Sequence, residues 1–224
     1  MTYAQPSMTE APRAPAAGYA AGRPTREQAS ALADRIVEAA ALLIAQNGYQ
    51  ATSVEAIARA AGVAKRTVYS RFAGKPQLLA AVLRLLAGKL TPPMTMGLTH
   101  LDLRTRLETL GRHLLRYCLS EEAITWTRLI SSELARVPEL ADTVQQEAVG
   151  VVDGFTRNLL QTAIEAGEMP PVDIAFAART YSQLMTAPAR ALASTGAAPG
   201  TTAEQNRYIV QAVDFFLRGC GVTP

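Results

Sequence analysis

Residues 52–79 read TSVEAIARAAGVAKRTVYSRFAGKPQLL, and the order of apolar, glycine and basic residues in this stretch decides the fold. Its first half places apolar residues at i, i+3, i+4 and i+7, the period of one helix face: Val54, Ile57, Ala58 and Ala61. Gly62 interrupts that period, and a second short helix fits residues 64–70, with Val63, Val68 and Phe72 facing inward. Two short helices joined by a tight glycine turn are typical of the helix-turn-helix unit.

The second of these helices presents a basic surface rich in hydrogen-bonding groups. Outside its inward positions it carries cations, hydroxyl groups and one aromatic ring, at Lys65, Arg66, Thr67, Tyr69, Ser70 and Arg71. Such groups bind phosphates, and they contact base edges when a helix enters the major groove of DNA. The pattern alone leaves a solvated basic face as the alternative.

Helix-start signals flank the unit on both sides. Thr52-Ser53-Val54-Glu55 has the form of a capping box, with Thr52 as the N-cap. Gly74-Lys75-Pro76 precedes a helix that we expect to run to about residue 90, because proline is tolerated in a first helical turn. Upstream, another helix starts at residue 25 and ends at Asn47-Gly48, where both residues tolerate positive φ.

The rest of the chain predicts an all-α protein with about nine helices. Residues 1–24 are rich in proline and small residues and read as a disordered arm, in which Arg23 either reaches a DNA minor groove or belongs to a solvated tail. Residues 25–90 form the helix-turn-helix domain, with its motif at about 53–72, and residues 91–224 form a second helical domain. In this second domain we expect a long helix from Leu140 to near Gly167, one at 173–194 that contains Pro188, and a last one opened by a capping box at Thr201.

Composition excludes several classes of protein. Apolar residues make up 49% of the 224 positions, and two cysteines form neither a disulfide scaffold nor a grouped zinc site. No apolar run approaches a membrane span and no secretory signal opens the chain, so we expect a cytoplasmic protein without a membrane partner. The net charge of +3 divides unevenly: residues 1–90 carry 11 basic and five acidic residues, the remainder 11 and 14. The positive half fits a polyanionic partner.

The central stretch also resembles the DNA-binding domain of the tetracycline-repressor (TetR/AcrR) family over about residues 28–85. The resemblance rests on Thr52-Ser53-Val54, Ile57-Ala58, Ala61-Gly62-Val63, and above all on the spacing of Tyr69, Phe72 and Lys75. It implies that residues 64–70 contact the major groove, that Thr52 or Ser53 contacts a phosphate, and that Tyr69 and Lys75 do so as well. The resemblance also implies base contacts at Lys65, Arg66 and Thr67. We expect Ser70 to contact DNA as well. Ala64, Arg66 and Arg71 depart from the common family pattern and leave the operator sequence open.

The second domain resembles, more weakly, a C-terminal ligand-binding and dimerisation domain of one branch of this family, through residues 127–141. This resemblance implies a homodimer through the last two long helices and a pocket for a small, mostly apolar or aromatic effector. Candidate pocket residues, each of which could equally be ordinary core, are His113, Tyr117, Trp126, Arg128, Phe155 and Met185.

Taken together, the sequence predicts a homodimeric repressor that a small molecule releases from a palindromic operator. It offers no catalytic set, so we expect no enzyme, no cofactor and no metal site. Activation in place of repression stays open. The rival hypothesis is an all-α small-molecule-binding protein or enzyme without specific DNA binding.

Overall fold

The structure, a computed structural model, describes residues 26–89, 100–196 and 198–222. Within these ranges the chain is helical and contains no β-strand, which confirms the all-α prediction. The predicted arm at residues 1–24 and the predicted domain boundary at residue 91 lie outside the described residues.

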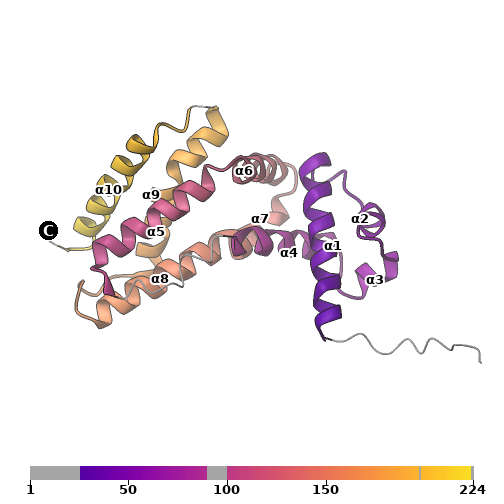
Figure 1. Ribbon diagram of the computed structural model, residues 1–224, viewed down its shortest axis with the longest axis horizontal. Coiled ribbons are helices and arrows are strands. Elements are labelled where there is room, and N and C mark those ends of the chain that lie inside the picture. The colour runs from indigo at the N-terminus through magenta and orange to yellow at the C-terminus, as the bar shows by residue number, and fades with distance from the viewer. Residues whose placement is uncertain (1–25, 90–99, 197, 223–224) are drawn as a thin grey trace, which may run out of the picture.

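Four helices form the N-terminal end of the described chain: α1 (Arg26–Asn47), α2 (Val54–Ala60), α3 (Lys65–Tyr69) and α4 (Lys75–Gly88). Their apolar faces meet in one core that includes the fully buried Ile36, Ile57, Val68 and Leu78. α2 and α3 lie on the outer side of α1, and α4 runs from them toward the middle of the molecule (Figure 1).

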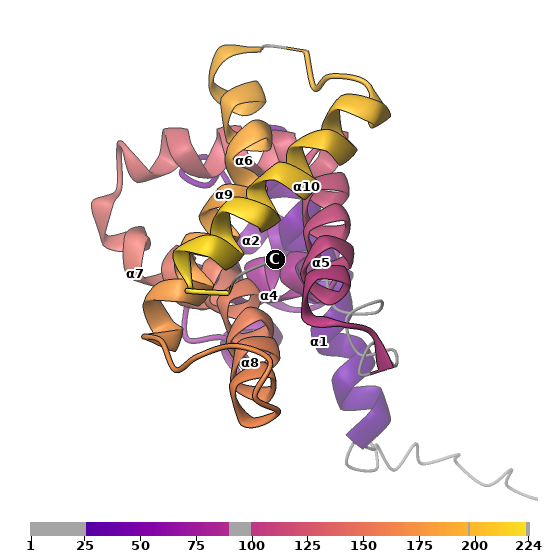
Figure 2. The same cartoon turned by 90° about the vertical axis from the view of Figure 1, so that its left-hand side faces the viewer.

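The remaining helices build a second core. They are α5 (Leu103–Cys118), α6 (Glu121–Leu134), α7 (Ala141–Val144), α8 (Gly150–Glu165), α9 (Ile174–Thr195) and α10 (Thr202–Gly219). The buried faces of α5, α8, α9 and α10 enclose this core, in which the ring of Tyr181 packs edge-on against Phe216. α10 forms the outer face of the molecule at the end opposite to α3 (Figures 1 and 2).

The predicted helix from Leu140 to near Gly167 is present, with one irregularity. A 3-10 turn, η3 (Pro138–Leu140), precedes α7, and a π-helical turn, η4 (Gln145–Val149), joins α7 to α8 without a break. α7, η4 and α8 therefore act as one helix, and the described residues hold the nine helical segments that the sequence predicts. Pro188 lies inside α9, which continues to Thr195.

Helix caps agree with the sequence in most places and differ in one. The capping box of α10 is complete, because Thr201 and Glu204 bond each other's backbone N–H groups. At α2 the prediction is wrong: the N-cap is Ser53, whose side chain accepts a hydrogen bond from the Ala56 N–H. Thr52 instead turns its hydroxyl into the protein, where it reaches the carbonyl oxygens of Gly48 (2.8 Å) and Leu43 (3.1 Å) at the end of α1.

The two cores are joined by α4 and α6. Trp126 of α6 and Leu140 of η3 are buried in the N-terminal core, although they follow the predicted boundary in sequence. α4 is held from the other side: the Tyr117 hydroxyl donates to the carbonyl oxygen of Leu86 at 2.9 Å, and Lys89 pairs with Glu122 at 2.6 Å. The position of α2 and α3 is therefore tied, through α1 and α4, to the helices of the C-terminal half.

Candidate nucleic-acid interface

The turn between α2 and α3 is closed by glycine and by backbone hydrogen bonds. Gly62 adopts φ +67°, a conformation that costs other residues energy. The N–H groups of Gly62 and Val63 return to the carbonyl oxygens of Arg59 (3.1 Å) and Ala58 (2.9 Å), which ends α2. Ile57 and Val68 are fully buried on either side of the turn. Burial of these two side chains fixes which face of α3 points to solvent.

That solvent face of α3 carries the residues the sequence singled out. Lys65, Arg66 and Ser70 are exposed, and Tyr69 leaves 48% of its surface in solvent although it is a large aromatic residue. Thr67 is half-buried, and its carbonyl oxygen accepts a hydrogen bond from the Ser70 hydroxyl at 2.9 Å. An exposed tyrosine between cations and hydroxyls offers a phosphate both a donor and positive charge.

Lys65 has a partner in the free protein. Its ammonium pairs with the Glu55 carboxylate of α2 and lies 5.7 Å from the centroid of the Tyr69 ring. The hydrogen bond to Lys65 lowers the pKa of Glu55, and the bond to Glu55 raises the pKa of Lys65. Both side chains are about half exposed, so a binding partner can compete with Glu55 for Lys65.

Lys75, at the start of α4, is half-buried and held at two points. Its ammonium donates to the Gln50 carbonyl oxygen at 3.0 Å and lies 4.4 Å from the centroid of the Tyr49 ring. Burial lowers the pKa of Lys75, and the negative charge of Glu133 opposes that shift. A cation and a ring at this distance attract each other, so the ammonium already has a fixed position in the free protein.

Thr52 and Ser53, the two alternatives for a phosphate contact, differ in exposure. Thr52 is only 3% exposed and its hydroxyl is committed to α1. Ser53 is exposed; its oxygen accepts a hydrogen bond from the Ala56 N–H at 3.1 Å, and its side chain also hydrogen-bonds the Glu55 carboxylate. Ser53 is therefore the better placed of the two.

The six candidate effector residues are spread over α5, α6, α8 and α9. Met185 is fully buried against α5, where a Cβ on Gly111 would lie 2.6 Å from its sulfur. His113 and Phe155 are half-buried on α5 and α8. Arg128 is exposed and donates to the carbonyl oxygens of Ala193 (2.9 Å) and Leu192 (3.4 Å) near the end of α9.

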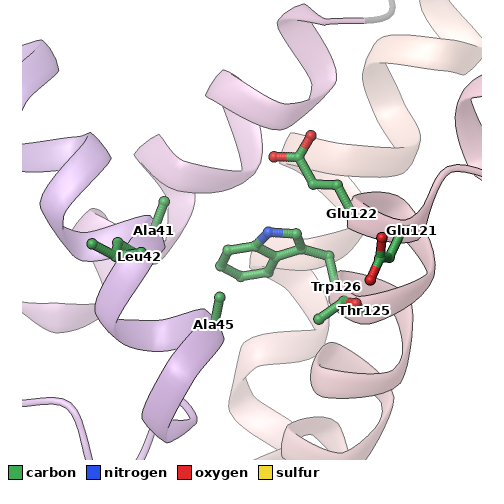
Figure 3. A pocket seen from close by; sticks show the side chains of 7 residues that line it. All are labelled: Ala41, Leu42, Ala45, Glu121, Glu122, Thr125 and Trp126. Carbon is green, nitrogen blue, oxygen red and sulfur yellow. The ribbon is translucent and has the colours of Figure 1, made fainter.

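Trp126 lines a groove between α1 and α6. The groove encloses about 480 Å³, and its lining is formed by Ala41, Leu42, Ala45, Glu121, Glu122, Thr125 and Trp126. The indole ring stands between the small α1 side chains and the Glu122 carboxylate (Figure 3). Tyr117, by contrast, serves the contact with α4, and burial raises its pKa to about 12.

Sequence reasoning missed Glu133. It is 3% exposed, and its carboxylate accepts a hydrogen bond from the Tyr49 N–H at 3.0 Å, across the two halves of the protein. A signal was present, because Trp126, Ile130 and Glu133 follow the i, i+4, i+7 spacing of one helix face. A carboxylate on an apolar stripe requires a buried partner.

A four-helix N-terminal domain with a solvent-facing basic helix, continuous with a helical bundle, defines a helix-turn-helix DNA-binding regulator. Two family models match the chain: "Bacterial regulatory proteins, tetR family" over residues 36–82, and "AefR-like transcriptional repressor, C-terminal domain" over residues 105–221. The chain belongs to the TetR family of transcriptional regulators, and it is a regulator of this kind and not an enzyme.

Known relatives agree with this assignment. A helix-turn-helix-type transcriptional regulator of Mycobacterium tuberculosis is 32% identical over 128 residues, which cover 57% of this chain and 60% of that protein. The chain thus matches less than two thirds of the length of this curated relative. Among solved structures, a TetR-family regulator from Mesorhizobium loti is 26% identical, with a TM-score of 0.69 over 87% of this chain and 98% of that one. The flavonoid-responsive regulator FrrA is also 26% identical, with a TM-score of 0.71 over 85% and 97%.

Across the described ranges, none of the helices is both long and apolar enough to cross a membrane. The same residues hold no group of three histidine, cysteine or acidic side chains placed to bind a metal ion.

Proposed function

We propose that this chain is a cytoplasmic, homodimeric repressor that binds a palindromic operator through α3 and is released by a small aromatic effector. The observation that carries the proposal is the solvent face of α3, where Lys65, Arg66, Tyr69 and Ser70 surround the buried anchor Val68. An amphipathic helix with this outer face fits the major groove, and the packing of its buried side fixes its position on the surface of the domain.

Within this proposal the DNA-contacting residues divide by chemistry. Lys65, Arg66 and Thr67 contact base edges at the start of α3, where a helix comes nearest to the floor of the groove. Ser53, Tyr69 and Lys75 contact phosphates, with Ser70 beside them. In this proposal Thr52 does not contact DNA itself. Its hydroxyl binds the end of α1 and so helps to position its neighbour Ser53. The excess of positive charge in residues 1–90 favours the same face.

The homodimer is proposed through α9 and α10. Phe176 of α9 and Phe215 of α10 are each 70% exposed, and Val210 of α10 is 41% exposed. Exposed apolar side chains of this size are typical of protein interfaces. A pair related by two-fold symmetry would present two copies of α3, one to each half-site of a palindrome.

The proposal of effector release rests on a family model, on one structural neighbour, and on the contacts between the N-terminal and C-terminal halves of the protein. The C-terminal family model describes transcriptional repressors, and the structural neighbour FrrA is flavonoid-responsive. A planar aromatic molecule is therefore the effector class to test first. Binding of the effector would shift the equilibrium between two positions of α3 only by the difference between its affinities for the two states.

The test is a fluorescence-anisotropy titration of the protein into duplex DNA from upstream of its own gene, with a shuffled duplex of equal composition as control. We expect tighter binding to the upstream duplex, and weaker binding as salt rises. Equal binding to both duplexes would remove the specific-regulator proposal.

A variant with Tyr69→Phe and Lys75→Ala tests the assigned phosphate contacts. Loss of one hydrogen bond and one charge contact should weaken binding about tenfold or more, because each is worth roughly 1 kcal/mol or above. Arg157→Ala, which removes an exposed charge of α8, is the matched control and should leave binding unchanged. Retained affinity in the double variant would contradict the assignment.

A further inference from the structure

Glu133 is a buried carboxylate that belongs to α6 but serves the N-terminal domain. Its Oε1 accepts the Tyr49 N–H at 3.0 Å, and its Oε2 is buried without a hydrogen-bond partner among the described residues. The backbone of the same residue ends α6, since the N–H groups of Arg136 and Val137 both donate to the Glu133 carbonyl oxygen. The carboxylate thus belongs to the end of α6, and it moves with α6 and not with the N-terminal domain.

The segment it binds, Gly48 to Gln50, is built around that carboxylate. Gly48 adopts φ +84°, and a Cβ at this position would lie 3.0 Å from Glu133 Oε1. The Tyr49 side chain is 5% exposed and belongs to the N-terminal core. We call residues 48–50 the α1–α2 turn. The Glu133 hydrogen bond ties this turn to α6, while the Thr52 hydroxyl holds the turn to the end of α1.

The opposite side of the α1–α2 turn holds Lys75. Both groups that place the Lys75 ammonium belong to this turn: the Gln50 carbonyl oxygen at 3.0 Å and the Tyr49 ring at 4.4 Å. The chain of contacts therefore runs from Glu133 to Tyr49 and Gln50, and from these to Lys75. It links the last turn of α6 to the first turn of α4.

We propose that Glu133 is a positioning residue for DNA binding, which holds the α1–α2 turn so that Lys75 meets a phosphate. The inference rests on the proposed function, in which Lys75 contacts the DNA backbone. Glu133 acts through the hydrogen bond to Tyr49 and touches no DNA itself. Because it belongs to α6, the phosphate contact of Lys75 depends on where α6 lies.

The experiment measures the affinity of full-length variants for the upstream duplex over a range of salt concentrations. Each phosphate contact contributes about 0.9 to the slope of log affinity against log salt. Glu133→Ala should lower the slope by about one phosphate contact per protomer, as Lys75→Ala does. Glu133→Gln, which keeps an acceptor for the Tyr49 N–H, should keep the wild-type slope. Glu139→Ala removes an exposed carboxylate of η3 and is the matched charge control.

A structural role alone would lower thermal stability and leave the salt slope unchanged, so the slope separates the two roles. The variant with both Glu133→Ala and Lys75→Ala should show the slope of Lys75→Ala alone. A wild-type slope in Glu133→Ala, or additive losses in the double variant, would overturn the inference. If Glu133→Ala does not fold, Glu133→Asp retracts the carboxylate by one methylene and keeps its charge. It should lose the slope contribution, and a wild-type slope there would overturn the inference equally.

Failure of the inference and failure of the proposed function give different results. A wild-type protein that does not prefer the upstream duplex, or a Lys75→Ala variant with the wild-type slope, contradicts the proposed function. A reduced slope in Lys75→Ala together with a wild-type slope in Glu133→Ala contradicts the role of Glu133 alone.

Discussion

At the scale of single residues, several side chains satisfy two demands at once. Tyr49 donates its N–H to Glu133 and places its ring against Lys75, and Ser53 caps α2 while it stays exposed. Gly48 is the sharpest case, because its backbone conformation and its contact with Glu133 both exclude a side chain. Such positions connect the stability of the fold with the geometry of the proposed DNA contacts.

Gly48→Ala should therefore destabilise the protein. Left-handed backbone costs a non-glycine residue roughly 1–3 kcal/mol, and the added Cβ presses on a buried carboxylate oxygen. Urea unfolding should show a free energy of unfolding lower by at least about 1 kcal/mol.

Gly88→Ala is the control for this substitution. Among the described residues, a Cβ at Gly88 would meet no neighbouring atom within 4 Å, and the backbone there does not adopt positive φ. The variant should be neutral or slightly stabilising, because alanine lowers the conformational entropy of the unfolded chain. An equal loss of stability in both variants would contradict the role given to Gly48.

At the scale of elements, a short helix such as α3 keeps its orientation through neighbours and not through its own length. With five residues it cannot persist alone, and it relies on the buried Val68 and on the capped helix α2. Ser53 at that cap has two roles, and a single substitution can separate them.

Ser53→Asp should keep the fold and lose DNA binding. Aspartate is as good an N-cap as serine, so the free energy of unfolding should change by less than about 0.5 kcal/mol. The new carboxylate would stand where we propose a phosphate, and repulsion should weaken binding to the upstream duplex at least about tenfold. Anisotropy titration and urea unfolding measure the two effects. Ser120→Asp makes the same change at the N-cap of α6 and should leave DNA binding intact; parallel losses in both variants would refute a contact at Ser53.

Much of the fold follows from sequence at this scale, and the exceptions have physical causes. Glycine turns, capping residues and apolar stripes place α2, α3, α9 and α10 within about a residue of their observed ends. The N-cap of α2 shifts from Thr52 to Ser53 because the end of α1 needs a buried donor, which only the packed structure reveals. The π-helical turn η4 has no local signal of this kind. The effector candidates stay a prediction, because residue type alone does not say which side chains share a cavity.

At the scale of the whole molecule, the near-neutral charge is the sum of two unlike halves. Residues 1–90 have a net charge of +6 and the rest −3. α2 and α3 stand at one end of the molecule and α10 at the other (Figure 1). The positive half suits DNA, and the exposed Phe176 of α9 and Phe215 of α10 suit a second copy of the chain.

Phe215→Asp should convert the proposed dimer to a monomer. A carboxylate in an apolar interface is desolvated without a partner, which is strongly unfavourable. Sedimentation velocity should report half the wild-type mass. Leu42→Asp is the control, because Leu42 is equally apolar and 57% exposed but lies on α1. A dimeric Phe215→Asp protein, or a monomeric Leu42→Asp protein, would contradict an interface on α9 and α10.

Footprinting on DNA from upstream of the protein's own gene is the decisive experiment, because it reports the helix-turn-helix contact and the dimer together. We expect the wild-type protein to protect two half-sites related by two-fold symmetry, and Phe215→Asp to lose this paired protection. Protection of the shuffled duplex to the same extent, or a single unpaired site with the wild-type protein, would show that the chain is not the dimeric operator-binding regulator proposed here.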